Sequence, residues 1–155
     1  MNKTEFVYVT FIRTTPERLW TALTDREFTA KYWFGASCES AWTAGSPWAL
    51  RYADGRLADS GEILESDPPR RLVIKWRNEW NPAFKAEGDA LCTMTLEPVA
   101  DVEVPVVKLS ITHSIERADS AFIGAVSGGW PRILSNLKSL VETGEILMKP
   151  AAHAA

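Results

Sequence analysis

The sequence predicts a single α+β domain in which a curved antiparallel sheet wraps around a C-terminal helix. Three patterns lead to this prediction: an early strand followed by two short helices, a long middle stretch of strand and turn signals, and one apolar helical stripe near the end. A chain of 155 residues has the usual size of one domain. It is long enough to bury a core without a disulfide or a metal ion.

The first predicted strand covers residues 6–12, where side chains alternate with a period of two. Val7, Val9 and Phe11 fall on one side, and the other side carries Tyr8 and Ile12 among its members. Because both sides are largely apolar, this pattern predicts a strand that is covered on both faces.

Two short helices are predicted directly after this strand. The segment Thr14-Thr15-Pro16-Glu17 has a threonine cap, an early proline and a glutamate three residues after Thr14, which together indicate a helix start. The segment Thr24-Asp25-Arg26-Glu27 repeats the capping pattern, and Gly35 is expected to end the second helix.

The middle of the chain carries only strand and turn signals. Short turn segments such as Asp54-Gly55 and Asp67-Pro68-Pro69 separate the strands, so consecutive antiparallel pairing is expected. Alternation places Leu72, Ile74 and Trp76 on a shared apolar face. The predicted strands are Ser37–Ala41, Trp48–Tyr52, Ala58–Ser66, Arg71–Trp76, Ala90–Glu97 and Val106–His113.

The apolar face of this sheet needs a cover, and the C-terminal segment supplies one. Apolar residues recur with helical spacing from Trp130 to Val141. Pro131 suits the first turn of this helix and Gly144 suits its C-cap, while residues 121–128 either extend the helix or form a separate turn. The domain is predicted to span residues 1–148, followed by a disordered tail at 149–155.

Composition excludes several classes of protein. The net charge is −3 and no basic stripe exists, so nucleic-acid binding is not expected. No apolar run is long enough for membrane insertion, and no signal-peptide core is present, which makes the cytoplasm the expected location. Cys38 and Cys92 have no CxxC spacing and are expected to be buried apolar residues. No metal-ligand or catalytic motif occurs, so neither a cofactor nor recognisable catalysis is predicted.

The order of elements and several segments resemble the SRPBCC superfamily, the START-like and birch-pollen-allergen-like proteins with a helix-grip fold. More narrowly, they resemble the branch related to the activator of the ninety-kilodalton heat-shock chaperone's ATPase. The resemblance extends from about Glu5 to Gly144 and is specific for the fold rather than for an activity. The segments that carry it are residues 12–25 (IRTTPERLWTALTD), 32–35 (YWFG), 67–72 (DPPRRL) and 128–140 (GGWPRILSNLKSL).

The resemblance implies a cavity between the sheet and the long helix, and the seven tryptophans of the chain suggest either an unusually aromatic core or an aromatic-lined cavity. We expect a small apolar or aromatic ligand there. His113 is the one candidate for a chemical role, and Trp80 is expected in a loop, either as a lid or packed on the body. The predicted ligand-binding residues are Trp33, Phe34, Trp48, Leu50, Ile74, Trp76, Met94, Leu109, Ile111, His113, Trp130, Leu134 and Leu137.

Two other functions fit the same residues. The first is a protein-interaction role resembling that of the chaperone ATPase activator, which predicts an exposed apolar patch. The second is an enzyme such as a cyclase or hydrolase acting on a substrate in the cavity, which needs a polar group inside it. An uncovered edge strand can also pair with a second copy to form a homodimer.

Overall fold

The computed structural model describes residues 2–150 and confirms the α+β, helix-grip architecture. Seven antiparallel strands form one sheet in the order β1-β7-β6-β5-β4-β3-β2, so that six strands make a meander and β1 joins beside β7. Residues 151–155 of the predicted tail lie outside the described residues. The strands are β1 (Thr4–Ile12), β2 (Ser37–Ser40), β3 (Pro47–Arg51), β4 (Leu57–Asp67), β5 (Arg71–Asn78), β6 (Ala90–Pro98) and β7 (Val107–Ile115).

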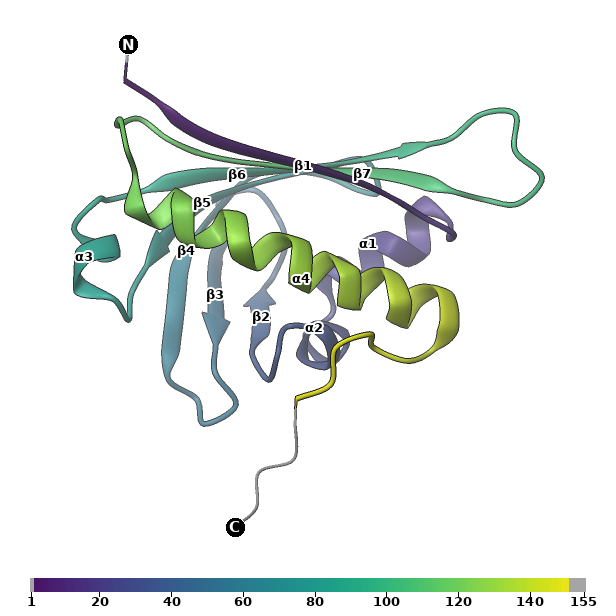
Figure 1. The fold of residues 1–155 in the computed structure, drawn as a ribbon, viewed down its shortest axis with the longest axis horizontal. Helices are drawn as coiled ribbons and strands as arrows, with labels where there is room; N and C mark the ends of the chain where they lie inside the picture. The colour runs from purple at the N-terminus through teal and green to yellow at the C-terminus, as the bar shows by residue number, and fades with distance from the viewer. Residues whose placement is uncertain (1, 151–155) are drawn as a thin grey trace.

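The sheet curves around one long helix (Figure 1). This helix is α4 (Ala121–Thr143), and it covers one face of the sheet. The short helices α1 (Pro16–Thr24) and α2 (Arg26–Tyr32) lie toward the C-terminal end of α4, whereas α3 (Pro82–Lys85) lies beyond its N-terminal end (Figure 1). No helix within residues 2–150 is long and apolar enough to cross a membrane.

The two N-terminal helices are capped by side chains, and each cap lies one residue after the threonine at which the predicted capping pattern begins. The hydroxyl of Thr15, rather than that of Thr14, accepts a hydrogen bond from the Arg18 backbone N–H at 3.2 Å. The reason is Pro16, which occupies the first helical position and so makes the residue before it the cap. In α2 the cap is the carboxylate of Asp25, which accepts from the backbone N–H of Glu27, whereas the repeated capping pattern places the cap at Thr24, the last residue of α1.

Helix α4 begins nine residues before Trp130, so the prediction that Pro131 lies in its first turn is wrong. The apolar stripe continues upstream through the buried Phe122 and Ile123, and this burial keeps the glycine-containing segment helical. Ser120 caps the true start, and the carboxylate of Glu87 accepts hydrogen bonds from its hydroxyl and from the first backbone N–H groups. Gly144 forms the predicted left-handed C-cap with φ of 86°.

The prediction that the first strand is covered on both faces is also wrong. Val7, Val9 and Phe11 are 54%, 43% and 51% exposed, because α4 covers only the opposite face of β1. Strand β1 is also one edge of the sheet. These three side chains therefore form an apolar row on an edge strand, which we call the β1 row.

Candidate ligand-binding cavity

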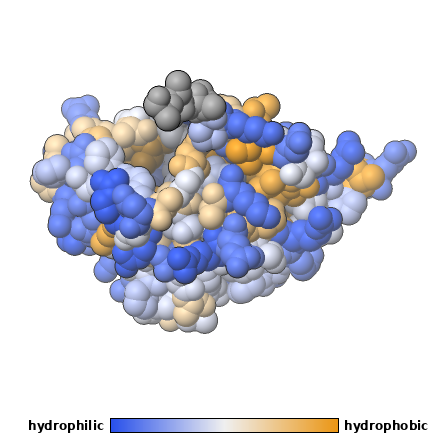
Figure 2. Space-filling model, turned by 90° about the horizontal axis from the view of Figure 1, so that it is seen from below, coloured by the Kyte–Doolittle hydropathy of each residue, from blue (hydrophilic) through white to orange (hydrophobic). Residues whose placement is uncertain are grey.

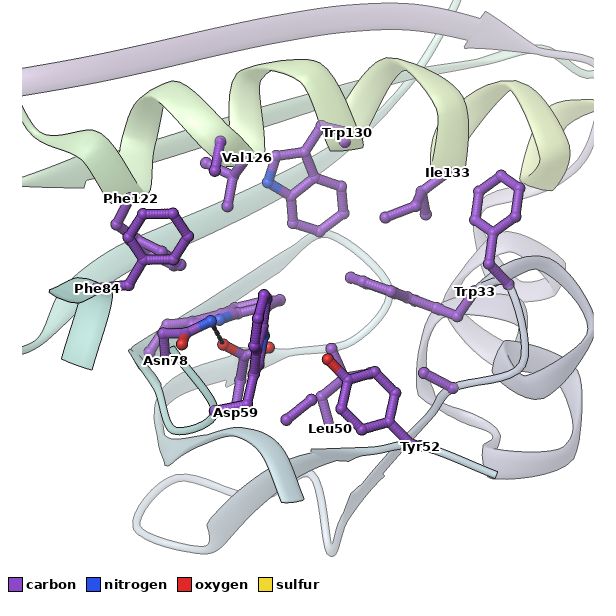
Figure 3. Close-up of a pocket in the computed structure, with 17 residues that line it drawn as sticks. Trp33, Leu50, Tyr52, Asp59, Asn78, Phe84, Phe122, Val126, Trp130 and Ile133 are labelled. Carbon is purple, nitrogen blue, oxygen red and sulfur yellow. Dashed lines mark hydrogen bonds between the residues drawn. The ribbon is translucent and has the colours of Figure 1, made fainter. Parts of the chain in front are cut away.

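A cavity of about 350 Å³ lies between α4 and strands β3 to β5. Its walls are mainly apolar, which is the usual composition of a small-molecule site. Figure 3 shows side chains from the helix and from the sheet converging on this space. It is lined by Trp33, Phe34, Ala36, Leu50, Tyr52, Ala58, Asp59, Trp76, Asn78, Trp80, Phe84, Phe122, Ala125, Val126, Gly129, Trp130 and Ile133.

One wall of the cavity comes from α4. Phe122, Val126, Trp130 and Ile133 follow one another at helical spacing and point toward the sheet (Figure 3). Phe122 and Val126 belong to the upstream half of the helix, the part whose structure the sequence left open. The extension of α4 to residue 121 therefore supplies half of this wall.

Three indoles separate the cavity from the packed core, and we call Trp33, Trp76 and Trp130 the tryptophan wall. The Trp33 and Trp130 ring centroids are 5.4 Å apart, and Trp76 lies 6.2 Å from Trp33 and 5.8 Å from Trp130. All three also line a second void of only about 10 Å³, which lies among core residues. The wall thus has a hollow side and a filled side.

A fourth indole, that of Trp48, packs against Trp76 on the filled side of this wall. The contact is possible because the residue between them, on β4, is a glycine. Trp48, Gly61 and Trp76 are direct neighbours across β3, β4 and β5, and the rings of Trp48 and Trp76 are 4.2 Å apart. A Cβ atom at Gly61 would overlap the backbone carbonyl of Lys75. Glycine is therefore required at this close approach of two strands.

The next cross-strand row carries the polar group of the cavity. Leu50, Asp59 and Asn78 are neighbours across the same three strands. The Asn78 amide donates to the Asp59 carboxylate at 3.0 Å, the bond drawn in Figure 3. Its carbonyl oxygen accepts from the Asn81 backbone N–H at 2.9 Å, which fixes the amide orientation and points the NH₂ group at Asp59.

Asp59 is only 6% exposed, and burial raises its pKa to about 6. The indole N–H of Trp76 and the amide of Asn78 oppose this rise, although the indole lies outside hydrogen-bond geometry. The nearby Glu79 shows the contrast, because it pairs with Arg77 and Lys85 at 2.9 and 3.1 Å. A hydrogen bond from Ser60 and these two cations lower the pKa of Glu79 to about 2. Within residues 2–150, Asp59 forms no salt bridge.

His113 lies behind the tryptophan wall rather than in the cavity. Its Nδ1 accepts a hydrogen bond from the Trp130 indole at 3.0 Å, and its ring also contacts Trp76 and Phe122. Burial lowers the pKa of His113 to about 3, so the imidazole is neutral. It does not line the cavity, and an enzyme acting there would have to use Asp59 or Tyr52 instead.

The cavity reaches the surface at two aromatic residues. Trp80 is 54% exposed and Phe34 is 41% exposed, yet both also line the cavity. Trp80 contacts Phe84 edge to face, and Phe84 comes from α3, a short helix that the sequence did not predict. Hydrophobic residues also gather among hydrophilic ones on the face shown in Figure 2.

The thirteen predicted residues divide into three groups. Five line the cavity: Trp33, Phe34, Leu50, Trp76 and Trp130. Four lie on the filled side of the tryptophan wall, around the small void: Trp48, Ile74, Met94 and Leu134. The other four are buried in the core and line neither space: Leu109, Ile111, His113 and Leu137.

Asp59 and Asn78 were missed, although the sequence held a signal for both. Ile63 is an inward residue of β4, and a period of two places Gly61 and Asp59 on the same face. Asn78 shares the face of Trp76 once β5 is extended by two residues beyond its predicted end. Only the apolar residues of each inward face were predicted to line the cavity, and the polar residues on the same faces were not included.

Comparison with known proteins identifies the family. Residues 13–142 match the family described as activator of Hsp90 ATPase homolog 1-like protein, and the chain therefore belongs to this family within the SRPBCC superfamily. Comparison with curated proteins finds no match. Among the residues described, no group of three or more His, Cys, Asp or Glu side chains is arranged to hold a metal ion.

Solved structures show the same fold. A protein from Mesorhizobium loti superposes with a TM-score of 0.73 at 24% identity, covering 88% of this chain and 96% of its own. The Aha1 dimer from Colwellia psychrerythraea gives 0.71 at 20% identity, covering 91% and 98%. An HSP90 activator from Plasmodium falciparum gives 0.68 at 22% identity, covering 88% and 94%.

Proposed function

We propose that this protein binds a small apolar or aromatic molecule in the cavity between the sheet and α4, as a carrier or sensor in the cytoplasm. The cavity of about 350 Å³ with its aromatic lining is the observation that carries the proposal. A well-packed core leaves few voids larger than a water molecule, and a mainly apolar cavity of this size offers a favourable site to an apolar ligand. Cys38 and Cys92, both free thiols, suit a reducing compartment.

Titration with a neutral flavone, followed by tryptophan fluorescence, tests this proposal. Flavones absorb where tryptophan emits, so a molecule held against Trp33, Trp76 and Trp130 should quench the emission in a saturable way. Trp33→Phe should reduce the quenching, because Trp33 is half-buried at the cavity wall. The control is Trp20→Phe on α1, since Trp20 lines neither void. Quenching that rises linearly without saturation, equally in all three proteins, would contradict binding in the cavity.

A second candidate function is action on an Hsp90-type chaperone. The family match and the shared fold of the HSP90 activator from Plasmodium falciparum favour it. The β1 row supplies the exposed apolar surface that such a contact needs. The test is the ATPase rate of the chaperone with and without this protein. Stimulation that is lost in Val9→Lys but kept in Leu64→Lys, a change at an exposed residue of β4, would support it. An unchanged rate would remove this candidate.

The same β1 row is the proposed surface for a homodimer. The dimeric structure from Colwellia psychrerythraea motivates this, and β1 leaves one edge without a neighbouring strand. Size-exclusion chromatography with light scattering should give twice the chain mass for the wild type and one chain mass for Val9→Lys. A monomer at all concentrations would exclude this surface as a self-association site.

A further inference from the structure

Asp59 is the one charged residue among those that line the cavity. The rest of the lining is apolar or aromatic apart from the Asn78 amide and the Tyr52 hydroxyl, which points into the space (Figure 3). A buried carboxylate without a cation is unfavourable, because it has lost its hydration and gained no opposite charge. Glu79, close by, has two cations, so the chain can supply them where it needs them. Among the described residues, Asp59 therefore lacks a cationic partner even though cationic side chains pair with a carboxylate close by.

The aromatic residues of the cavity favour the same kind of partner. The electron-rich faces of Trp, Tyr and Phe attract cations, and quaternary or protonated amines are commonly held between such rings. The cavity combines this property with a single carboxylate at its floor. The aromatic members of the lining are Trp33, Phe34, Tyr52, Trp76, Trp80, Phe84, Phe122 and Trp130.

The carboxylate is also held in a fixed position. Asn78 donates to one of its oxygens, and the Asn78 amide is itself fixed by the Asn81 backbone. Within the part of the chain that the structure describes, no donor lies in hydrogen-bond geometry with the second oxygen of Asp59, and the Trp76 indole N–H, which lowers the pKa of this carboxyl, is itself without a partner. This oxygen is available to a donor group on a molecule in the cavity.

We infer that the ligand is an aromatic or alicyclic amine whose ammonium group pairs with Asp59, while its apolar part packs against the tryptophan wall. This inference rests on the proposed function of the cavity and names the chemical class of its ligand. Asp59 supplies the charge, the aromatic rings supply the cation–π attraction, and Asn78 positions the carboxylate.

The charge on Asp59 can be varied by pH because its neighbours do not titrate in the same range. Glu79 stays ionised between pH 5 and 8, and Tyr52 and Cys38 stay neutral because burial raises the pKa of each. His113 stays neutral because its pKa is lowered. Binding of an amine that stays protonated between pH 5 and 8 should therefore weaken as the pH falls through the pKa of Asp59, which is about 6.

Isothermal titration calorimetry with three probes that share one ring tests the inference. The probes are 1-naphthylmethylamine (cation), 1-naphthalenemethanol (neutral) and 1-naphthoate (anion). At pH 7.5 we expect the cation to bind roughly tenfold or more tighter than the alcohol, and the anion to bind weakest. At pH 5 the preference for the cation should be largely lost.

Two variants assign the preference to one carboxylate. Asp59→Asn keeps the size and the acceptor for Asn78, and it should reduce cation binding to about the level of the alcohol, while alcohol binding should change much less because the alcohol carries no charge to pair. Asp54→Asn is the matched control, because Asp54 is an exposed carboxylate in the turn before β4. It should leave all three affinities unchanged.

The outcomes separate this inference from the function on which it rests. If the alcohol and the cation bind equally to the wild type, or if Asp59→Asn keeps the preference, the amine assignment is overturned and the apolar cavity stands. If neither the three naphthalene probes nor the flavone binds, the proposed function and this inference both fail.

Discussion

On the filled side of the tryptophan wall, Leu72, Ile74, Met94 and Leu134 leave a void of only about 10 Å³. On the hollow side, about 350 Å³ stays open against the same three indoles. The difference follows from the size of the partner side chains. Large aliphatic side chains and the ring of Trp48 pack behind the wall, whereas four small residues lie in front of it: Ala36, Ala58, Ala125 and Gly129. A cavity therefore arises in this fold where small residues face rigid rings.

The largest expected effect comes from removing the support behind the wall. Gly61→Ala places a methyl group against the carbonyl of Lys75, and β4 and β5 must separate to accommodate it. We expect a loss of about 3 kcal/mol or more in the free energy of unfolding, measured by urea denaturation. Gly124→Ala is the control, since a Cβ atom there meets nothing within 4 Å and should be neutral or slightly stabilising. Equal stability of both variants would contradict this role of Gly61.

Two consecutive residues of α4 allow the filled and hollow sides of the tryptophan wall to be compared directly. Leu134 faces the filled side and is fully buried, whereas Ile133 is half-buried and faces the cavity. Leu134→Ala should cost about 3 kcal/mol, because it removes buried surface and leaves a new void. Ile133→Ala should cost about 1 kcal/mol, because its neighbourhood is already open. Similar losses in chemical denaturation would mean that the cavity closes up in solution.

The buried charge on the hollow side makes stability depend on pH. The pKa of Asp59 is higher in the folded chain than in the unfolded chain, so its favourable contribution is complete below pH 3.8 and is lost as the pH rises through about 6. Asp59→Asn should avoid this loss. We expect it to stabilise the protein by about 2 kcal/mol at pH 8 and to change little at pH 3.5. A variant that is less stable than the wild type at pH 8 would show that hydrogen bonds already offset the cost of burying the ionised Asp59 carboxylate.

The smallest expected effect on stability comes from filling the cavity. Ala125→Leu lies on the cavity side of α4 and should change the free energy of unfolding by less than about 0.5 kcal/mol. It should nevertheless weaken binding of a neutral flavone roughly tenfold, because the added side chain occupies the ligand space. Ala121→Leu, on the same helix but outside the lining, should bind the flavone normally. Binding that is unchanged in Ala125→Leu would place the ligand elsewhere.

Local periodicity predicted the filled side better than the hollow side. The inward residues Leu72, Ile74 and Trp76 follow from alternation, and Leu134 and Leu137 follow from the helical stripe. Both patterns describe where a side chain points, and burial follows from that direction. They do not describe how much space remains between two elements, which depends on the combined shapes of residues far apart in the chain.

The hollow side depends on features that single-element patterns cannot contain. The start of α4 was not predicted because glycines have a low intrinsic helix propensity. Burial of Phe122 against the rest of the protein outweighs this low propensity and keeps the segment helical. Trp80 and Phe84 reach the cavity through α3, whose four residues are too short for a periodic signal. Val7, Val9 and Phe11 were expected to be buried because their apolar character could not show which side the helix would cover.

The spacing of the indoles has an optical consequence. Trp33, Trp48, Trp76 and Trp130 form a chain of neighbours with centroid separations of 4.2 to 6.2 Å, and transitions of aromatic rings this close couple electronically. The circular dichroism of this protein should therefore contain a coupled signal from this group in addition to the signals of the separate tryptophans. Such a signal requires fixed side-chain packing, and it disappears when a compact chain loses that packing but keeps its secondary structure. One spectrum thus reports whether the tryptophan wall is packed as in the folded protein.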